Sequence, residues 1–155
     1  MIMEKCTLIA GVALVGWIVT SIGWIIQRYF ADQRETRKEI RDEIDKLENE
    51  TDKLLKSAHS YYCCSEVEER VIACSEITTS FNRLSGLVQR LEQFDNLKLQ
   101  KELDALYDAM TGGDFGSTRF TPDCVLYAEQ IKRFALLSEN LIEKAESWYR
   151  QIYQA

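Results

Sequence analysis

The sequence predicts an all-α protein: a single N-terminal transmembrane helix continues into a stalk helix, and an antiparallel bundle of three to four helices follows. Three observations lead to this fold class. A run of about twenty residues without a charged side chain opens the chain, which is the length of a membrane span. The 155-residue chain contains only one proline and seven glycines, and it is rich in good helix formers. Its apolar residues recur at intervals of three and four.

The charge-free run Cys6–Ile26 is expected to be a retained membrane anchor. A secretory signal is the competing interpretation, but the run is longer than a typical signal core and no small-x-small cleavage site follows it. The predicted organisation is a tail over 1–5, a transmembrane helix over 6–27, a stalk helix over 28–62, and a bundle over 65–155 with a loop over 111–121.

Basic residues follow the run, whereas only Lys5 precedes it. Those expected to contact lipid headgroups are Arg28, Arg34, Arg37, Lys38 and Arg41. This bias predicts a single-pass protein of the inner membrane with its N-terminus outside and its bundle in the cytoplasm. Five cysteines, two of them adjacent, do not form a secreted disulfide pattern and favour a reducing compartment. The acceptor pattern Asn49-Glu50-Thr51 points the other way, but it lies within a helical stretch.

Small and polar residues within the run follow a helical stripe. They are Ala13, Gly16, Thr20, Gly23 and Gln27. Such a stripe lets spans of separate copies pack closely, which predicts a homo-oligomer. The alternative is that these residue types are simply common in single spans. The run contains no charged residue, so a pore would be lined by Gly16, Thr20, Ser21 and apolar side chains and would gate by dewetting.

The predicted stalk carries a seam of apolar positions at four- and three-residue intervals: Ile40, Ile44, Leu47, Thr51, Leu54, Ala58 and Tyr61. This seam suits a partner helix either within the chain or in another copy. Ser65 and Glu68 match a capping box and predict the start of the next helix. The apolar face expected for that helix comprises Val67, Val71, Cys74, Thr78 and Phe81, and it continues through Leu84, Leu87, Val88 and Leu91. No internal repeat is visible.

The second predicted helix reaches Phe94, where Asp95-Asn96 marks either a break or a polar turn before the pattern resumes to Met110. Gly112-Gly113 is expected to end it with a left-handed residue. Thr121 as N-cap and Pro122 as first residue predict the start of the last helix.

The motif content predicts a protein that is not an enzyme and that needs no cofactor or metal. The chain has one histidine and lacks nucleotide-loop, nucleophile-elbow and HExxH patterns. His59 and Cys63 are four residues apart with Cys64 and Cys74 nearby, yet the second pair of ligands that a zinc site needs is absent. Free cysteines packed in a helix interface are the favoured interpretation.

The loop before the last helix is the candidate ligand site. Glycines, hydroxyls and one arginine between two phenylalanines suit an anion whose base could stack on an aromatic ring. The candidate binding residues are Ser117, Thr118, Arg119, Phe120, Lys132 and Arg133. The structural alternative is a helix hairpin with Phe115 and Phe120 tucked into the bundle end. A net charge of −6 argues against broad nucleic-acid binding and leaves a nucleotide or short oligonucleotide as the expected ligand.

In its layout of one span, a basic stalk and an acidic bundle, the chain resembles small membrane effectors of bacterial anti-phage systems, including the Hailong-type channel effectors governed by nucleotide messengers. The resemblance covers the whole chain at the level of layout and transfers no functional residue. It implies an antiviral, ligand-regulated homo-oligomeric ion channel, with a tetramer as the implied size. Two other functions stay open: a membrane tether or adaptor whose bundle recruits a partner protein, and an enzyme with an unrecognised site.

Overall fold

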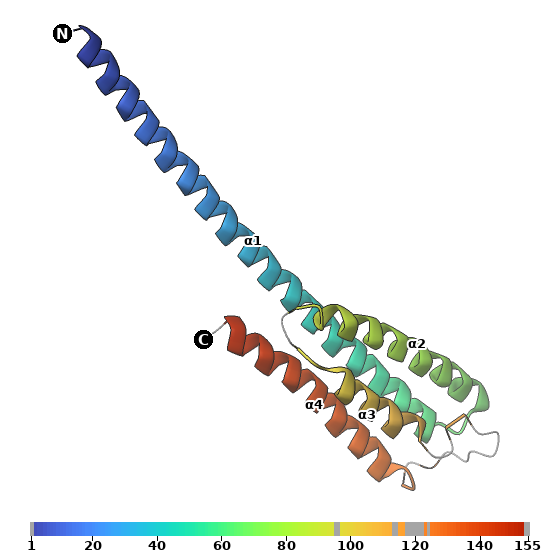
Figure 1. The fold of residues 1–155 in the computed structure, drawn as a ribbon. Helices are drawn as coiled ribbons and strands as arrows, with labels where there is room; N and C mark the ends of the chain where they lie inside the picture. Colours follow the sequence, from blue (N-terminus) through green and yellow to red (C-terminus); the bar gives the residue numbers. More distant parts are fainter. Residues whose placement is uncertain (1, 95–96, 113–114, 117–122, 124, 154–155) are drawn as a thin grey trace. The chain divides into compact units, whose positions relative to one another are not determined.

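The computed structural model describes residues 2–94, 97–112, 115, 116, 123 and 125–153, with side chains from Gly16 onward, and these residues form helices joined by turns and contain no strand. The four helices are α1 (Ile2–Cys63), α2 (Val67–Leu91), α3 (Gln100–Thr111) and α4 (Ala128–Tyr153) (Figure 1). The all-α prediction is confirmed for these residues. The chain divides into two compact units, Met1–Glu39 and Ile40–Ala155, and each is described by itself.

The first unit consists of the N-terminal part of α1. Its hydroxyl groups bond within the helix: Thr20 Oγ1 donates to the Gly16 carbonyl, and Ser21 Oγ donates to the Trp17 carbonyl at 2.9 Å. The Arg28 guanidinium lies 5.4 Å from the ring centroid of Trp24. Among the residues that the structure describes, none of the helices qualifies as a membrane span by its length and hydropathy.

The second unit is a helical bundle, as predicted, and it begins inside the segment expected to be the stalk. Residues 40–63 of α1 are its first helix. Arg41 pairs with Glu146 at 2.6 Å, and Tyr62, further along α1, accepts a hydrogen bond from Gln130, near the start of α4. The α1 segment and α4 therefore run antiparallel.

The seam of α1 packs inside its own chain. All seven seam positions, from Ile40 to Tyr61, are buried. All of them except Thr51 join side chains of the other three helices in one hydrophobic core. Burial of large apolar side chains, each contributing about 1.5–3 kcal/mol, accounts for the cohesion of the unit. The seam's partner is thus within the chain.

The structure corrects the start and the face of the second helix. α2 begins at Val67, and Glu66 at its N-cap makes no side-chain capping bond, so the predicted box of Ser65 and Glu68 is wrong. The buried face begins with Ala73 and Ile77. Val67 and Val71 are exposed. Thr78 is exposed as well. The remainder of the predicted face is confirmed, because Cys74 packs against the core and the following apolar positions are buried: Phe81, Leu84, Leu87, Val88 and Leu91.

The break between the second and third helices lies between Leu91 and Gln100, and the pair 95–96 within it lies outside the described residues. Glu92 stabilises the restart, because its Oε1 accepts from the backbone N–H groups of Leu99 at 2.6 Å and Gln100 at 2.9 Å. A carboxylate at a helix N-terminus also complements the helix dipole.

Gly112 ends α3 in an extended conformation (φ −67°, ψ 152°), which corrects the expected left-handed cap at this residue. A glycine is needed for a different reason: an added Cβ would lie 2.8 Å from the Asp108 carbonyl oxygen. Gly113, Thr121 and Pro122 lie outside the described residues. The turn before α4 is held by Asp123, whose Oδ1 accepts from the Val125 N–H at 2.8 Å.

A candidate anion-binding groove

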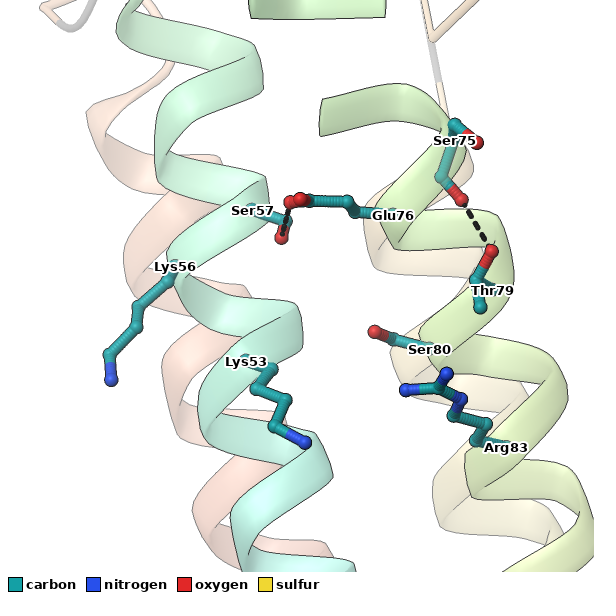
Figure 2. Close-up of a pocket in the computed structure, with 8 residues that line it drawn as sticks. All are labelled: Lys53, Lys56, Ser57, Ser75, Glu76, Thr79, Ser80 and Arg83. Carbon is teal, nitrogen blue, oxygen red and sulfur yellow. Dashed lines mark hydrogen bonds between the residues drawn. The ribbon is translucent and has the colours of Figure 1, made fainter. Parts of the chain in front are cut away.

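A hollow of about 410 Å³ lies between α1 and α2, and we name it the basic groove (Figure 2). It is lined by Lys53, Lys56, Ser57, Ser75, Glu76, Thr79, Ser80 and Arg83. Lys53 and Arg83 reach into the space between the two helices, whereas Lys56 points away from α2 at the rim. The lining thus combines three cations, four hydroxyls and one carboxylate.

The alignment of α1 against α2 brings acidic residues of α1 next to basic residues of α2. Glu43 of α1 accepts from Arg90 of α2 at 2.8 Å. Seven residues further along α1 and seven back along α2, Glu50 faces Arg83 at 3.6 Å. Each glutamate also pairs with a lysine three residues later, Lys46 or Lys53, at 2.6 Å. We call these two repeating sets the first and second rungs.

The third rung breaks the pattern and opens the hollow. At the next seven-residue step Ser57 replaces the glutamate and Glu76 replaces the arginine. Ser57 Oγ donates to Glu76 Oε2 at 2.7 Å. Ser57 and Ser80 are buried, and because their side chains are short, they leave unfilled the volume that an ion-pair rung would occupy.

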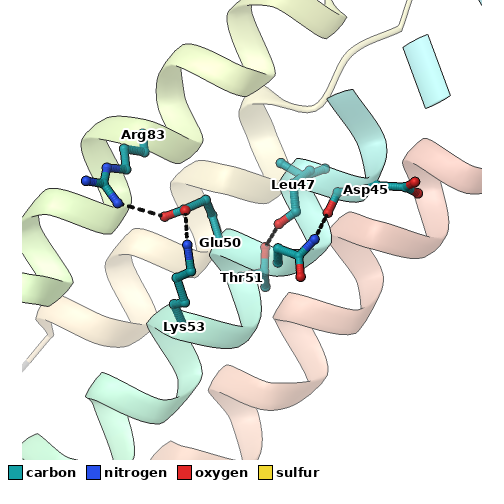
Figure 3. A network of polar contacts seen from close by, with 7 residues as sticks. Asp45, Leu47, Glu50, Thr51, Lys53 and Arg83 are labelled. Carbon is teal, nitrogen blue, oxygen red and sulfur yellow. Dashed lines mark hydrogen bonds and ion pairs between the residues drawn. The ribbon is translucent and has the colours of Figure 1, made fainter. Parts of the chain in front are cut away.

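The cations of the groove are only partly neutralised. Glu50 serves both Lys53 and Arg83 (Figure 3), and its distance to Arg83 exceeds normal hydrogen-bond length. Lys56 makes no ion pair with any described residue. Ammonium, guanidinium and hydroxyl donors around one hollow are the groups that bind phosphate oxygens. In a chain of net charge −6, this local arrangement suits an anionic ligand.

A neighbouring hollow of about 380 Å³ lies along the first rung, lined by Lys46, Glu50, Asn82, Arg83, Gly86, Leu87 and Arg90. Here Glu43 already bonds both Lys46 and Arg90. Burial acts to raise the pKa of the Glu43 carboxyl, but its hydrogen bonds to Lys46 and Arg90 outweigh burial and hold the pKa below its ordinary value. This hollow therefore offers an anion less uncompensated positive charge.

Most of the ligand site predicted from sequence lies outside the described residues: Ser117, Thr118, Arg119 and Phe120. Lys132 and Arg133 are exposed on α4, and neither lines the basic groove. Lys132 instead borders a mainly apolar hollow of about 420 Å³ with Leu55, His59, Cys63, Ala128, Ile131 and Ala135.

Phe115 favours the structural interpretation of this loop. Its ring centroid lies 4.9 Å from that of Tyr61, and Tyr61 Oη accepts from the Gly116 N–H at 2.8 Å. The ring of Tyr62 packs against that of Tyr61. Burial raises the pKa of the Tyr62 hydroxyl. Phe115 is thus occupied in packing rather than available to stack a base.

The cysteines differ from the prediction. Cys63 is disulfide-bonded, so the expectation of free cysteines is wrong at this residue, whereas Cys64 and Cys74 are free and half-buried. His59 Nε2 lies 3.7 Å from Cys63 Sγ. A disulfide sulfur is not a thiolate ligand, and no group of three metal-binding side chains occurs among the described residues.

The residues predicted to pack spans and to bind headgroups lie mainly in the first unit. Gly16, Thr20, Gly23 and Gln27 are exposed in the single chain, and the side chain of Ala13 is not described. Arg28, Arg34, Arg37 and Lys38 are exposed as well. Arg41 differs, because it pairs with Asp45 at 3.0 Å and with Glu146. These contacts place Arg41 in the bundle's own surface network.

Sequence reasoning missed the basic groove, although a short signal exists. The segments Glu43-Ile-Asp-Lys46 and Glu50-Thr-Asp-Lys53 are a repeat seven residues apart, contrary to the expectation that none is present. Its meaning depends on Arg83 and Arg90, which only the α1–α2 register brings alongside.

No protein-family model, curated protein or solved structure matches the chain.

Proposed function

We propose that the chain is a non-enzymatic, homo-oligomeric membrane effector that responds to an anionic ligand, a nucleotide or short oligonucleotide, bound in the basic groove. One observation carries this proposal. The same helix, α1, contains the charge-free run Cys6–Ile26 and also one wall of the basic groove, through Lys53, Lys56 and Ser57. Ligand binding in the groove would therefore act on the element that holds the membrane segment.

The stripe of small residues supports self-association. A Cβ added at Gly16 or Gly23 would meet nothing within 4 Å in the chain itself. That space suits a neighbouring span, and close packing of small residues drives helix association in lipid. We propose an oligomer, with a tetramer as the working size, that forms a pore or ion channel in antiviral defence, as the resemblance implies.

The proposed location is the inner membrane with the bundle in the cytoplasm. The basic residues Arg28, Arg34, Arg37 and Lys38 support this orientation. The disulfide at Cys63 favours the opposite side, since disulfides are typical of oxidising compartments. Fusions after Ala155 decide between them: a fluorescent protein that folds only in the cytoplasm should glow, whereas activity of a fused alkaline phosphatase would place the bundle outside.

Self-association is tested in detergent by mass measurement. Gly16→Leu and Gly23→Leu should each shift the full chain toward monomer, because a leucine fills the space between spans. Ile25→Leu, on the opposite side of the helix, is the matched control and should leave the mass unchanged. Potassium-loaded vesicles that contain the wild-type chain should release potassium when ATP or inorganic tripolyphosphate is added. Vesicles that contain either glycine variant should not.

A second function, the membrane tether, is favoured by one surface feature. Val67, Val71 and Ile72 are 64%, 65% and 58% exposed on α2, and grouped apolar side chains on a surface often bind a partner protein. A chain that is monomeric in detergent and produces no leak would contradict the effector and leave the tether.

A further inference from the structure

We infer, building on the proposed function, that the basic groove binds a polyphosphate chain and that Glu50 is an internal competitor which the phosphates displace from Lys53 and Arg83. The inference starts from the lining of the groove. No aromatic or large apolar side chain is among the lining residues. The described groove therefore recognises charge and hydrogen-bond acceptors and gives a base no surface on which to stack.

The size of the hollow and its donors indicate more than a single phosphate. A volume of about 410 Å³ falls in the range of sites for small organic ligands. Lys53 comes from α1 and Arg83 from α2, and both side chains extend into the space between the two helices (Figure 2). A chain of linked phosphates can contact both cations and the buried hydroxyl of Ser80.

Glu50 already occupies both cations. Its carboxylate lies 2.6 Å from Lys53 Nζ and 3.6 Å from an Arg83 guanidinium nitrogen, and its side chain is only 14% exposed (Figure 3). Its buried Oε2 makes no hydrogen bond within the described residues. Lys53 and Arg83 are 58% and 61% exposed, so both can turn toward a ligand. Glu50 is thus a weakly satisfied anion in direct competition with any phosphate.

The first rung supplies a matched control for each residue of the second. Glu43 pairs with Lys46 and Arg90 as Glu50 pairs with Lys53 and Arg83, but Glu43 and Arg90 do not line the basic groove. A substitution on the first rung removes the same kind of ion pair. It leaves the proposed binding site unchanged.

The experiment is calorimetric titration of the full chain in detergent with inorganic tripolyphosphate at fixed salt. Glu50→Gln should bind about tenfold more tightly than wild type, because Lys53 and Arg83 lose their internal partner. Glu43→Gln should stay within about twofold of wild type. Arg83→Gln should weaken binding, whereas Arg90→Gln should not. ATP and GTP should bind with equal affinity.

A double-mutant cycle tests the competition separately from folding. Arg83→Gln should cost more affinity in the Glu50→Gln background than in wild type, since Arg83 is then fully available. Equal costs, or unchanged affinity of Glu50→Gln while wild type binds and Arg83→Gln weakens it, would overturn the competition and leave the groove as the site. Absence of tripolyphosphate binding to both wild type and Glu50→Gln would refute the groove itself.

Discussion

The phenolic oxygen of Tyr62 lies 2.8 Å from the carbonyl oxygen of Met110, to which it donates a hydrogen bond. Gln130 Nε2 donates to the same phenolic oxygen at 2.8 Å and to the Ala109 carbonyl at 3.1 Å. This one buried hydroxyl group therefore joins the ends of α1 and α3 to the start of α4. Its removal leaves a buried acceptor without its partner.

Tyr62→Phe should lower the free energy of unfolding by about 1–3 kcal/mol. Urea denaturation followed by circular dichroism measures the change. Tyr107→Phe is the control, because Tyr107 is half exposed and packs on Phe81 mainly through its ring. Equal stability of Tyr62→Phe and wild type would show that the hydroxyl network does not hold the helix ends together.

The Glu43 carboxylate should make stability depend on pH. Because its pKa in the folded chain lies below the ordinary value of 4.5, its contribution is present above that value and is lost as the pH falls through the lowered pKa. Glu43→Gln should be less stable than wild type by about 1 kcal/mol at pH 7, since its partners are largely exposed. In urea titrations the two stabilities should converge as the pH is lowered progressively below 4.5. A constant difference across that range would contradict the assignment.

Replacement by alanine should change the stability of the protein in opposite directions at two glycines. Gly86→Ala should raise stability by about 0.5–1 kcal/mol, because the residue lies inside α2 and the new Cβ would be 3.6 Å from Arg90 Nη1, an ordinary contact. Gly112→Ala should lower stability by about 1 kcal/mol or more, because its Cβ would press on the Asp108 carbonyl at the end of α3. Thermal unfolding of the two variants measures both changes. Unchanged or higher stability of Gly112→Ala would refute the close approach at Gly112.

The Cys64 thiol should react slowly with alkylating reagents. It donates a hydrogen bond to Glu69 Oε2 at 2.6 Å, and this bond raises the pKa of the thiol. Glu69→Gln should lower the pKa and increase the rate of iodoacetamide alkylation at pH 8, because the thiolate is the reactive form. Peptide mass spectrometry gives the rate at Cys64 with Cys74 as the internal reference. An unchanged ratio of the two rates would contradict the hydrogen bond.

The sequence was sufficient for features that depend on local periodicity. The seam from Ile40 to Tyr61 is buried as its spacing predicts, and the all-helical bundle follows from the same pattern. The buried face in the first turns of α2 was not predictable, because Val71 and Ile77 are both apolar and only the tertiary packing decides which is covered. Likewise, Glu50 and Arg83 are thirty-three positions apart in the numbering, and their pairing depends on how two helices align.

The rungs between α1 and α2 also determine which misalignments the hairpin can tolerate. Sliding α2 by seven residues, about 10 Å, in one direction would keep an Arg83–Glu43 pair but would set Glu76 against Glu50, two like charges. A seven-residue shift of α2 in the opposite direction would keep an Arg90–Glu50 pair but would leave Glu43 without its arginine partner. The Glu–Arg repeat, interrupted at Ser57 and Glu76 where the groove lies, therefore also disfavours a shifted alignment of α1 and α2.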